Sequence, residues 1–155
     1  QIHIYRLDRL HIRQATPKDI PTLQKLEENG GFDIPPRVSS EWYKQFSAYE
    51  YAEILEGVFV AELDSDIVGY TIITQVLDRH HICETVLHSD YHGQGLGQEL
   101  MNFGSTYEKV FCEARVDNEP SRKMAYRCGF VNHSYIRNFY KDGSDAVLMV
   151  SKDWN

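Results

Sequence analysis

The sequence predicts a single domain of the mixed α/β class, and two observations support that prediction. Segments with strand and helix patterns follow in the order strand, two helices, three strands, helix, strand, helix and two strands. A strand that leads through a helix to a parallel neighbour forms a right-handed crossover. A length of 155 residues suits one core, and no repeat or linker divides the chain. We expect the domain over residues 11–155, with residues 1–10 as an N-terminal extension or an extra strand.

The N-terminal part is predicted to hold a strand, two helices and a hairpin. Thr16 caps a helix that Pro17 opens, and glycines after Asn29 end it. After a loop with two prolines, a second helix carries the aromatic residues from Trp42 to Phe46. Runs of β-branched and aromatic residues on both sides of a polar turn predict an antiparallel hairpin. These elements are the strand 11–15, helices at 17–28 and around 40–46, and the strands 57–63 and 67–73.

The C-terminal part is predicted to alternate strands and helices. Leu96, Leu100 and Phe103 recur on one face of a helix that follows a glycine-rich loop. The expected elements are the strand 81–87, this helix, the strand 110–116, the helix 120–128, and the strands 130–140 and 146–151.

Charge and composition exclude several classes of protein. A net charge of −7 opposes general affinity for nucleic acid, whose phosphates need a basic surface. No apolar run approaches the roughly 20 residues of a membrane span, so no membrane partner is expected. Cys83, Cys112 and Cys128 are scattered in apolar segments, which favours free thiols in a reducing, cytoplasmic compartment. No clustered set of histidines and cysteines predicts a metal site.

The glycine-rich loop is the strongest functional signal in the chain. Gly93, Gly95 and Gly97 stand at alternate positions between a strand and a helix. Glycines allow the backbone to approach a ligand closely, and the unpaired amides of a helix N-terminus attract a phosphate or diphosphate. The spacing differs from the dinucleotide fingerprint G-x-G-x-x-G, and no lysine follows as in a P-loop. A flexible loop without a ligand is the plain alternative.

Three motifs resemble the GNAT superfamily of N-acetyltransferases, in the right order over most of the chain. Gly95 and Gly97 fit the glycines of the family's acetyl-CoA loop, with His92 where the family has Arg or Gln. Residues 118–130 resemble the Asn-x-x-Ser/Ala…Gly-Phe segment. Residues 138–149 resemble the ending of ribosomal-protein alanine and other protein N-terminal acetyltransferases. The resemblance implies the GNAT fold, a central mixed, mostly antiparallel sheet with flanking helices and a splayed strand pair that binds acetyl-CoA.

The resemblance also implies a function. The protein would move an acetyl group from acetyl-CoA, its co-substrate, to a primary amine by direct attack in a ternary complex. The amine would belong to a protein N-terminus, a peptide or a small molecule, and a homodimer is left open. A non-catalytic, regulatory CoA-binding module is the alternative. The residues expected to bind the cofactor are Val86, Leu87, His88, His92, Gly93, Gln94, Gly95, Leu96, Gly97, Gln98, Asn118, Ser121 and Arg122.

Acetyl transfer to an amine needs a base, because a charged ammonium has no lone pair. Glu84, Glu113 and His81 are the candidates. A regular strand puts Glu84 on the opposite face from His81. Glu113 aligns with the glutamate proposed as the base of the ribosomal alanine enzymes. The three candidates stay open at this point.

The remaining groups are an oxyanion donor, an acid for the leaving thiolate and an acceptor wall. Amides around Val86 to His88 are expected to stabilise the oxyanion. Tyr126 is the candidate acid, although it stands one residue after the family's usual tyrosine, a rotation of about 100° on a helix. Phe139 and Tyr140, with Glu84, are expected to contact the acceptor.

Overall fold

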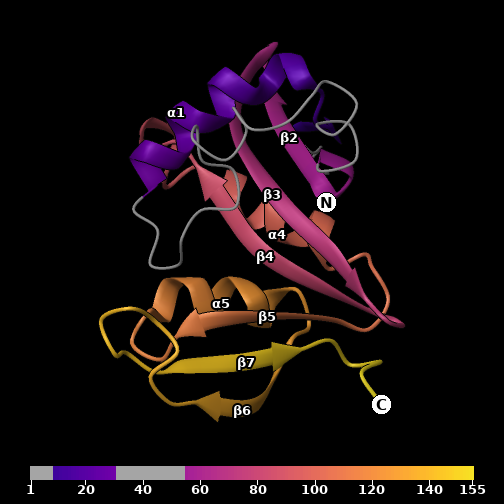
Figure 1. The fold of residues 1–155 in the computed structure, drawn as a ribbon, viewed down its shortest axis with the longest axis vertical. Coiled ribbons are helices and arrows are strands. Elements are labelled where there is room, and N and C mark those ends of the chain that lie inside the picture. Colours follow the sequence, from indigo (N-terminus) through magenta and orange to yellow (C-terminus); the bar gives the residue numbers. More distant parts are fainter. Residues whose placement is uncertain (1–8, 31–54) are drawn as a thin grey trace, which may run out of the picture.

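One seven-stranded sheet with helices on both faces makes up the fold (Figure 1). The computed structural model describes residues 9–30 and 55–155, and the sheet is counted within them. The strand order is β1-β2-β3-β4-β5-β7-β6, and only β4 and β5 pair in parallel. The strands are β1 His11–Gln14, β2 Val58–Leu63, β3 Asp66–Val76, β4 Arg79–Leu87, β5 Val110–Arg115, β6 Val131–Ile136 and β7 Ala146–Val150. The helices are α1 Ile20–Gly30, α4 Leu96–Gly104 and α5 Glu119–Arg127. The predicted mixed, mostly antiparallel sheet is confirmed.

Two predicted boundaries were wrong for local reasons. The first helix starts at Ile20, because Pro17–Asp19 forms a separate 3-10 turn. The Asp19 carboxylate accepts hydrogen bonds from the backbone NH and the hydroxyl of Thr16, at 2.8 and 3.2 Å, which closes that turn. Strand β6 ends at Ile136 rather than at residue 140, because the chain turns there, with Asn138 at a positive φ of 54°. The predictions for residues 1–8 and for the aromatic helix around 40–46 lie outside the described residues.

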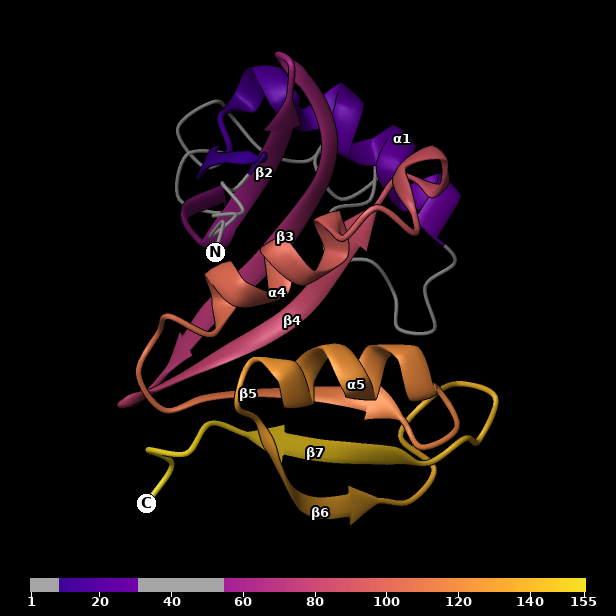
Figure 2. The ribbon, with the colours of Figure 1, turned by 180° about the vertical axis from the view of Figure 1, so that it is seen from behind.

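The core consists of three clusters of buried apolar residues. Two of them hold α1 and α4 on opposite faces of the sheet. Leu23 of α1 packs with Tyr70 and Val86 on one face. Leu100 of α4 packs with Val68 on the other, and Figure 2 shows α4 in front of β3 and β4. Helix α5 lies against the second half of the sheet, where its residue Ala125 is fully buried in the third cluster. Within residues 9–30 and 55–155, no helix is long and apolar enough to cross a membrane.

The sheet is nearly divided between β4 and β5. These strands pair at only two positions, His80 with Val110 and His81 with Phe111. Beyond them β4 continues against β3 to Leu87, while β5 continues against β7. Both figures show the two strands diverging from this junction. The expected splayed pair is therefore present.

Candidate functional site

A cleft of about 750 Å³ opens where β4 and β5 diverge. Both strands, the glycine loop, α4 and α5 contribute to its walls. Of the residues expected to bind a cofactor, those lining it are Val86, Leu87, His92, Gly93, Gly95, Gly97, Gln98, Asn118 and Ser121. The structure thus brings together the loop before α4 and the N-terminus of α5, two segments more than twenty residues apart in the sequence.

The loop owes its shape to glycine. Gly93 and Gly95 have φ values of 78° and 83°, in the left-handed region that other L-residues rarely adopt. Gly95 is the N-cap of α4, so the amides of the first helical turn have no acceptor within the helix. The His92 ring folds back, and its Nε2 lies 2.8 Å from the carbonyl oxygen of Leu87, which it donates to. The ring therefore fixes the loop to the end of β4.

The opposite wall is the N-terminal part of α5. The Asn118 side-chain oxygen accepts from the Ser121 amide at 3.2 Å and caps the helix. Met124 and Arg127 line the cleft as well, and sequence reasoning missed both. Their spacing from Pro120, four and then three residues, is the signal that would have found them, because such positions share one helix face.

Four of the expected cofactor residues are not among those that line the cleft. Arg122 donates to the carbonyl oxygen of Val116 at 2.7 Å and is held away from it. The Leu96 side chain is fully buried in the core beside Leu100. The carbonyl oxygen of Gln94 accepts a hydrogen bond from Arg9 on the outer surface. His88 is the fourth, because its ring turns to a different pocket.

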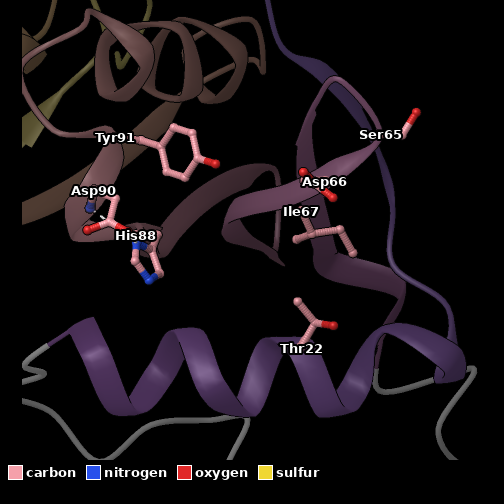
Figure 3. Close-up of a pocket in the computed structure, with 7 residues that line it drawn as sticks. All are labelled: Thr22, Ser65, Asp66, Ile67, His88, Asp90 and Tyr91. Atoms are coloured by element: carbon pink, nitrogen blue, oxygen red, sulfur yellow. Dashed lines mark hydrogen bonds and ion pairs between the residues drawn. The ribbon is translucent and has the colours of Figure 1, made fainter.

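That second pocket, of about 500 Å³, lies between α1 and the end of β4 (Figure 3). Its lining residues are Thr22, Ser65, Asp66, Ile67, His88, Asp90 and Tyr91. His88 Nδ1 accepts from the backbone NH of Asp90 at 3.1 Å, and its own backbone NH donates to Val68. Since that amide is already used in the sheet, it is unavailable to an oxyanion. None of the acid–base candidates lines this pocket.

A β-bulge in β4 brings the acid–base candidates onto one face of the sheet. Glu84 lies opposite Ile72 on β3, but Ile82 lies opposite the next residue, so Cys83 is an extra residue without a partner on that strand. His81 lies opposite Thr74, two positions from Ile72 on the same strand. Residues opposite alternate positions share a face, so the prediction that Glu84 and His81 face opposite ways was wrong. It assumed a regular strand.

His81 forms the closest contact of this cluster. Its Nε2 lies 2.7 Å from Glu113 Oε2 across the junction of β4 and β5, and its Nδ1 lies 3.5 Å from the Cys83 sulfur. The Phe111 ring stacks on it at 4.4 Å between centroids. Burial is the largest single influence on the pKa of His81 and lowers it, but the hydrogen bonds with Cys83 and Glu113 together outweigh burial and raise it to about 9. At neutral pH the ring is an imidazolium.

Glu84 lines the cleft from the same face. The Tyr70 hydroxyl, on a fully buried side chain, donates to Glu84 Oε2 at 3.3 Å. At another part of the wall stands Tyr140, whose ring lies under the Arg115 guanidinium at 4.5 Å. Phe139 packs edge-on against Tyr140 and does not itself line the cleft.

Tyr126 is not brought to the cleft. Its hydroxyl donates to Asn132 at 2.8 Å and accepts from the Arg122 guanidinium at 3.1 Å, on an exposed part of α5. The rotation by one helical residue thus turns it toward β6. No group of three His, Cys, Asp or Glu side chains suited to a metal ion occurs in the part of the chain that the structure describes.

Comparison with known proteins shows which family this chain resembles. Residues 23–130 match the model of the acetyltransferase (GNAT) family. The chain is 30% identical over 154 residues to an uncharacterised N-acetyltransferase of Methanocaldococcus jannaschii, covering 93% of this chain and 92% of that protein. It is 26% identical over 131 residues to an N-alpha-acetyltransferase of Sulfurisphaera tokodaii, covering 72% and 78%. A spermidine N-acetyltransferase from Vibrio cholerae, solved with CoA and spermine, shares the fold with a TM-score of 0.75 at 15% identity, covering 92% and 94%.

Proposed function

This chain belongs to the acetyltransferase (GNAT) family and is an acyltransferase, and we propose that it transfers acetyl from acetyl-CoA directly to the amine of a protein N-terminus. The observation that carries the proposal is the cleft between β4 and β5, which runs from the glycine loop to the acid–base cluster. The name of the 26% identical relative, an N-alpha-acetyltransferase, supports an N-terminal acceptor. A small amine is the second acceptor class, since the neighbour solved with spermine shares this fold.

The chemistry of the cleft walls fits coenzyme A. A diphosphate suits the unpaired amides at the start of α4, where the helix dipole also favours negative charge. A Cβ on Gly97 would lie 3.4 Å from the Met124 sulfur, so a larger residue there would narrow the cleft between the two helices. Gln98 lines the cleft, and its Oε1 is buried without a hydrogen-bond partner among the described residues. An amide NH of the pantetheine arm would satisfy that acceptor.

We assign the general base to Glu84. His81 holds a proton at neutral pH and is therefore unable to take one from an ammonium, and the Glu113 carboxylate accepts from the His81 ring. Glu84 lines the cleft, and the Tyr70 hydroxyl orients its carboxylate. A carboxylate in this position would take the amine proton directly or through water.

The His81–Glu113 pair is the proton store for the leaving thiolate in this proposal. A thiol has an ordinary pKa of about 8.5, so an imidazolium with a pKa of about 9 is well matched to protonate a departing thiolate. His81 does not itself line the cleft, whereas its partners Cys83 and Glu113 do. The proton would therefore pass along these partners or a water molecule. Tyr126 has no part in this scheme.

An acceptor panel with acetyl-CoA tests the proposal. With peptides that have a free N-terminus, thiol should be released from acetyl-CoA and an acetyl group should appear at that terminus. With the same peptides carrying a blocked N-terminus and an internal lysine, neither thiol release nor acetylation should be seen. Glu84→Gln should lower kcat by about 10²- to 10⁴-fold, the usual contribution of a general base. Glu108→Gln, the same change at an exposed position, is the matched control.

One observation favours the non-catalytic alternative, namely that the expected tyrosine acid points away from the cleft. If the protein binds CoA in calorimetry but no amine in the panel, including spermine, increases thiol release, the chain is a CoA-binding module. If only spermine is acetylated, the acceptor class proposed here is wrong.

A further inference from the structure

Cys83, His81 and Glu113 are arranged as a nucleophile, its proton partner and an orienting carboxylate. The Cys83 sulfur lies 3.5 Å from His81 Nδ1, and His81 Nε2 lies 2.7 Å from Glu113 Oε2. Cys83 and Glu113 line the cleft, and His81, which does not line it, contacts both of them. A thiol is activated by a histidine in this way when a third group orients the ring. The cluster is thus equipped for a reaction of its own.

The bulge and the neighbouring rings hold this arrangement. Cys83 is the extra residue of the bulge, so its backbone is not constrained to a regular pair with β3. The Thr74 hydroxyl contacts the Cys83 sulfur at 3.3 Å. Phe111 lies parallel to the His81 ring, with an interplanar angle of 4°, and fixes its plane.

The other two cysteines lack these features. Cys112 is buried, and its burial raises the pKa of the thiol to about 12, which keeps it protonated and unreactive. The Cys128 thiol donates to Asn102 at 2.9 Å, and burial raises its pKa as well. Neither has a histidine partner among its hydrogen bonds in the described residues. Cys83 is the cysteine that the fold prepares for reaction.

We propose that Cys83 is itself an acyl acceptor, which takes the acetyl group from acetyl-CoA as a thioester when no amine occupies the cleft. This rests on the proposed function for its acetyl donor. The Cys83 sulfur, as a thiolate beside protonated His81, forms a bond to the acetyl carbon, and the bond from that carbon to the CoA sulfur breaks. The CoA thiolate leaves and is protonated by the His81 proton, which passes through Glu113 or a water molecule because His81 does not itself line the cleft. One thioester is exchanged for another, with no oxidant or reductant.

The charges of the cluster suit this step. The His81 ring keeps its proton at neutral pH between the Cys83 sulfur and the Glu113 carboxylate. A positive ring beside the sulfur stabilises a thiolate, which is the reactive form of cysteine. The carboxylate on the other side stabilises the positive ring.

Intact-mass spectrometry with acetyl-CoA and no amine tests the proposal. The wild type should gain one acetyl group that hydroxylamine removes and that maps to the Cys83 peptide. Cys83→Ala should not gain it, and the matched variant Cys128→Ser should. If the amine panel is acetylated while Cys83 never carries acetyl, this inference is overturned and the proposed function stands. If Cys83 carries acetyl but no amine is ever acetylated, the inference stands and the proposed function fails.

Alkylation by iodoacetamide gives a readout that needs no acetyl donor. Cys83 should react about tenfold faster than Cys128, and added CoA should protect it. His81→Gln should remove this difference while leaving the circular dichroism spectrum unchanged. Equal rates at Cys83 and Cys128 in the wild type would overturn the inference, as would an unchanged Cys83 rate in the folded His81→Gln variant.

Discussion

Replacing Glu113 by Gln should remove a pH-dependent part of the stability of the protein. The pKa of His81 is 6.5 in its ordinary state and about 9 in the fold. Between these two values the folded protein binds more protons than the unfolded chain. The contribution of the protonated His81 ring to the stability of the fold is therefore complete below about pH 6.5 and is lost as the pH rises through about 9.

The magnitude follows from the same values. Each tenfold change in proton affinity is worth about 1.4 kcal/mol, so the rise to about 9 corresponds to about 3 kcal/mol. The imidazole retains 19% of its exposure, and solvent screening reduces the expected effect to roughly 2 kcal/mol. Two groups raise the pKa of His81 against the effect of burial, first Cys83 through its hydrogen bond and then Glu113 through its hydrogen bond and charge. Glu113→Gln leaves Cys83 alone to oppose burial, so the stability of this variant should lose most of its dependence on pH.

Urea unfolding at a series of pH values measures the effect. The wild type should have a higher free energy of unfolding than Glu113→Gln near pH 6. This difference between the two proteins should be smaller near pH 10, by roughly 2 kcal/mol. NMR titration of the His81 ring should show its pKa falling toward 6.5 in the variant. Glu108→Gln, at an exposed site, should leave both unchanged. A His81 that titrates near 6.5 in the wild type, or a stability difference that is the same at both pH values, would refute the reasoning.

Three further predictions concern the fold and the site. In the wild type the Arg13 guanidinium lies 2.8 Å from the buried carboxylate of Asp19 and lowers the pKa of that carboxyl. Arg13→Leu leaves the carboxylate without this partner and should destabilise the protein by about 3 kcal/mol at neutral pH, as measured by urea unfolding. The loss should shrink as the pH falls below 3.8, the ordinary pKa of the carboxyl, because protonation removes the charge that the guanidinium balances, and a constant loss would contradict the explanation. Gly69→Ala would place a Cβ 2.4 Å from a carbonyl oxygen of β4 and should cost at least about 2 kcal/mol in thermal unfolding. Gly93→Ala, whose Cβ meets nothing within 4 Å but whose φ is 78°, should cost only about 1 kcal/mol, and an equal loss in both variants would contradict the expected cost of the clash at Gly69. Tyr126→Phe should keep kcat within about twofold, because its hydroxyl lies outside the cleft; a loss of about a hundredfold in steady-state assays would restore it as the acid.

Part of the site could be predicted because its signals are local. Gly93 and Gly95 adopt the positive φ that their type permits, and Asn118 caps α5 through the amide three residues on. The family resemblance seen in these motifs is confirmed by the match over residues 23–130. Arg122 was placed at the cleft from its position in a motif, but a helix has several faces, and the carbonyl oxygen of Val116 holds this side chain elsewhere.

The sequence by itself determined the family, the order of most elements and the loop before α4, since these follow from residue type and from spacing within one segment. Only the tertiary structure decided how the acid–base groups meet. One extra residue in β4 turns Glu84 to the face of His81, and the junction of β4 with β5 brings His81 within 2.7 Å of Glu113, thirty-two residues away. Strand register and the divergence of strands depend on packing between distant segments, which no local pattern records.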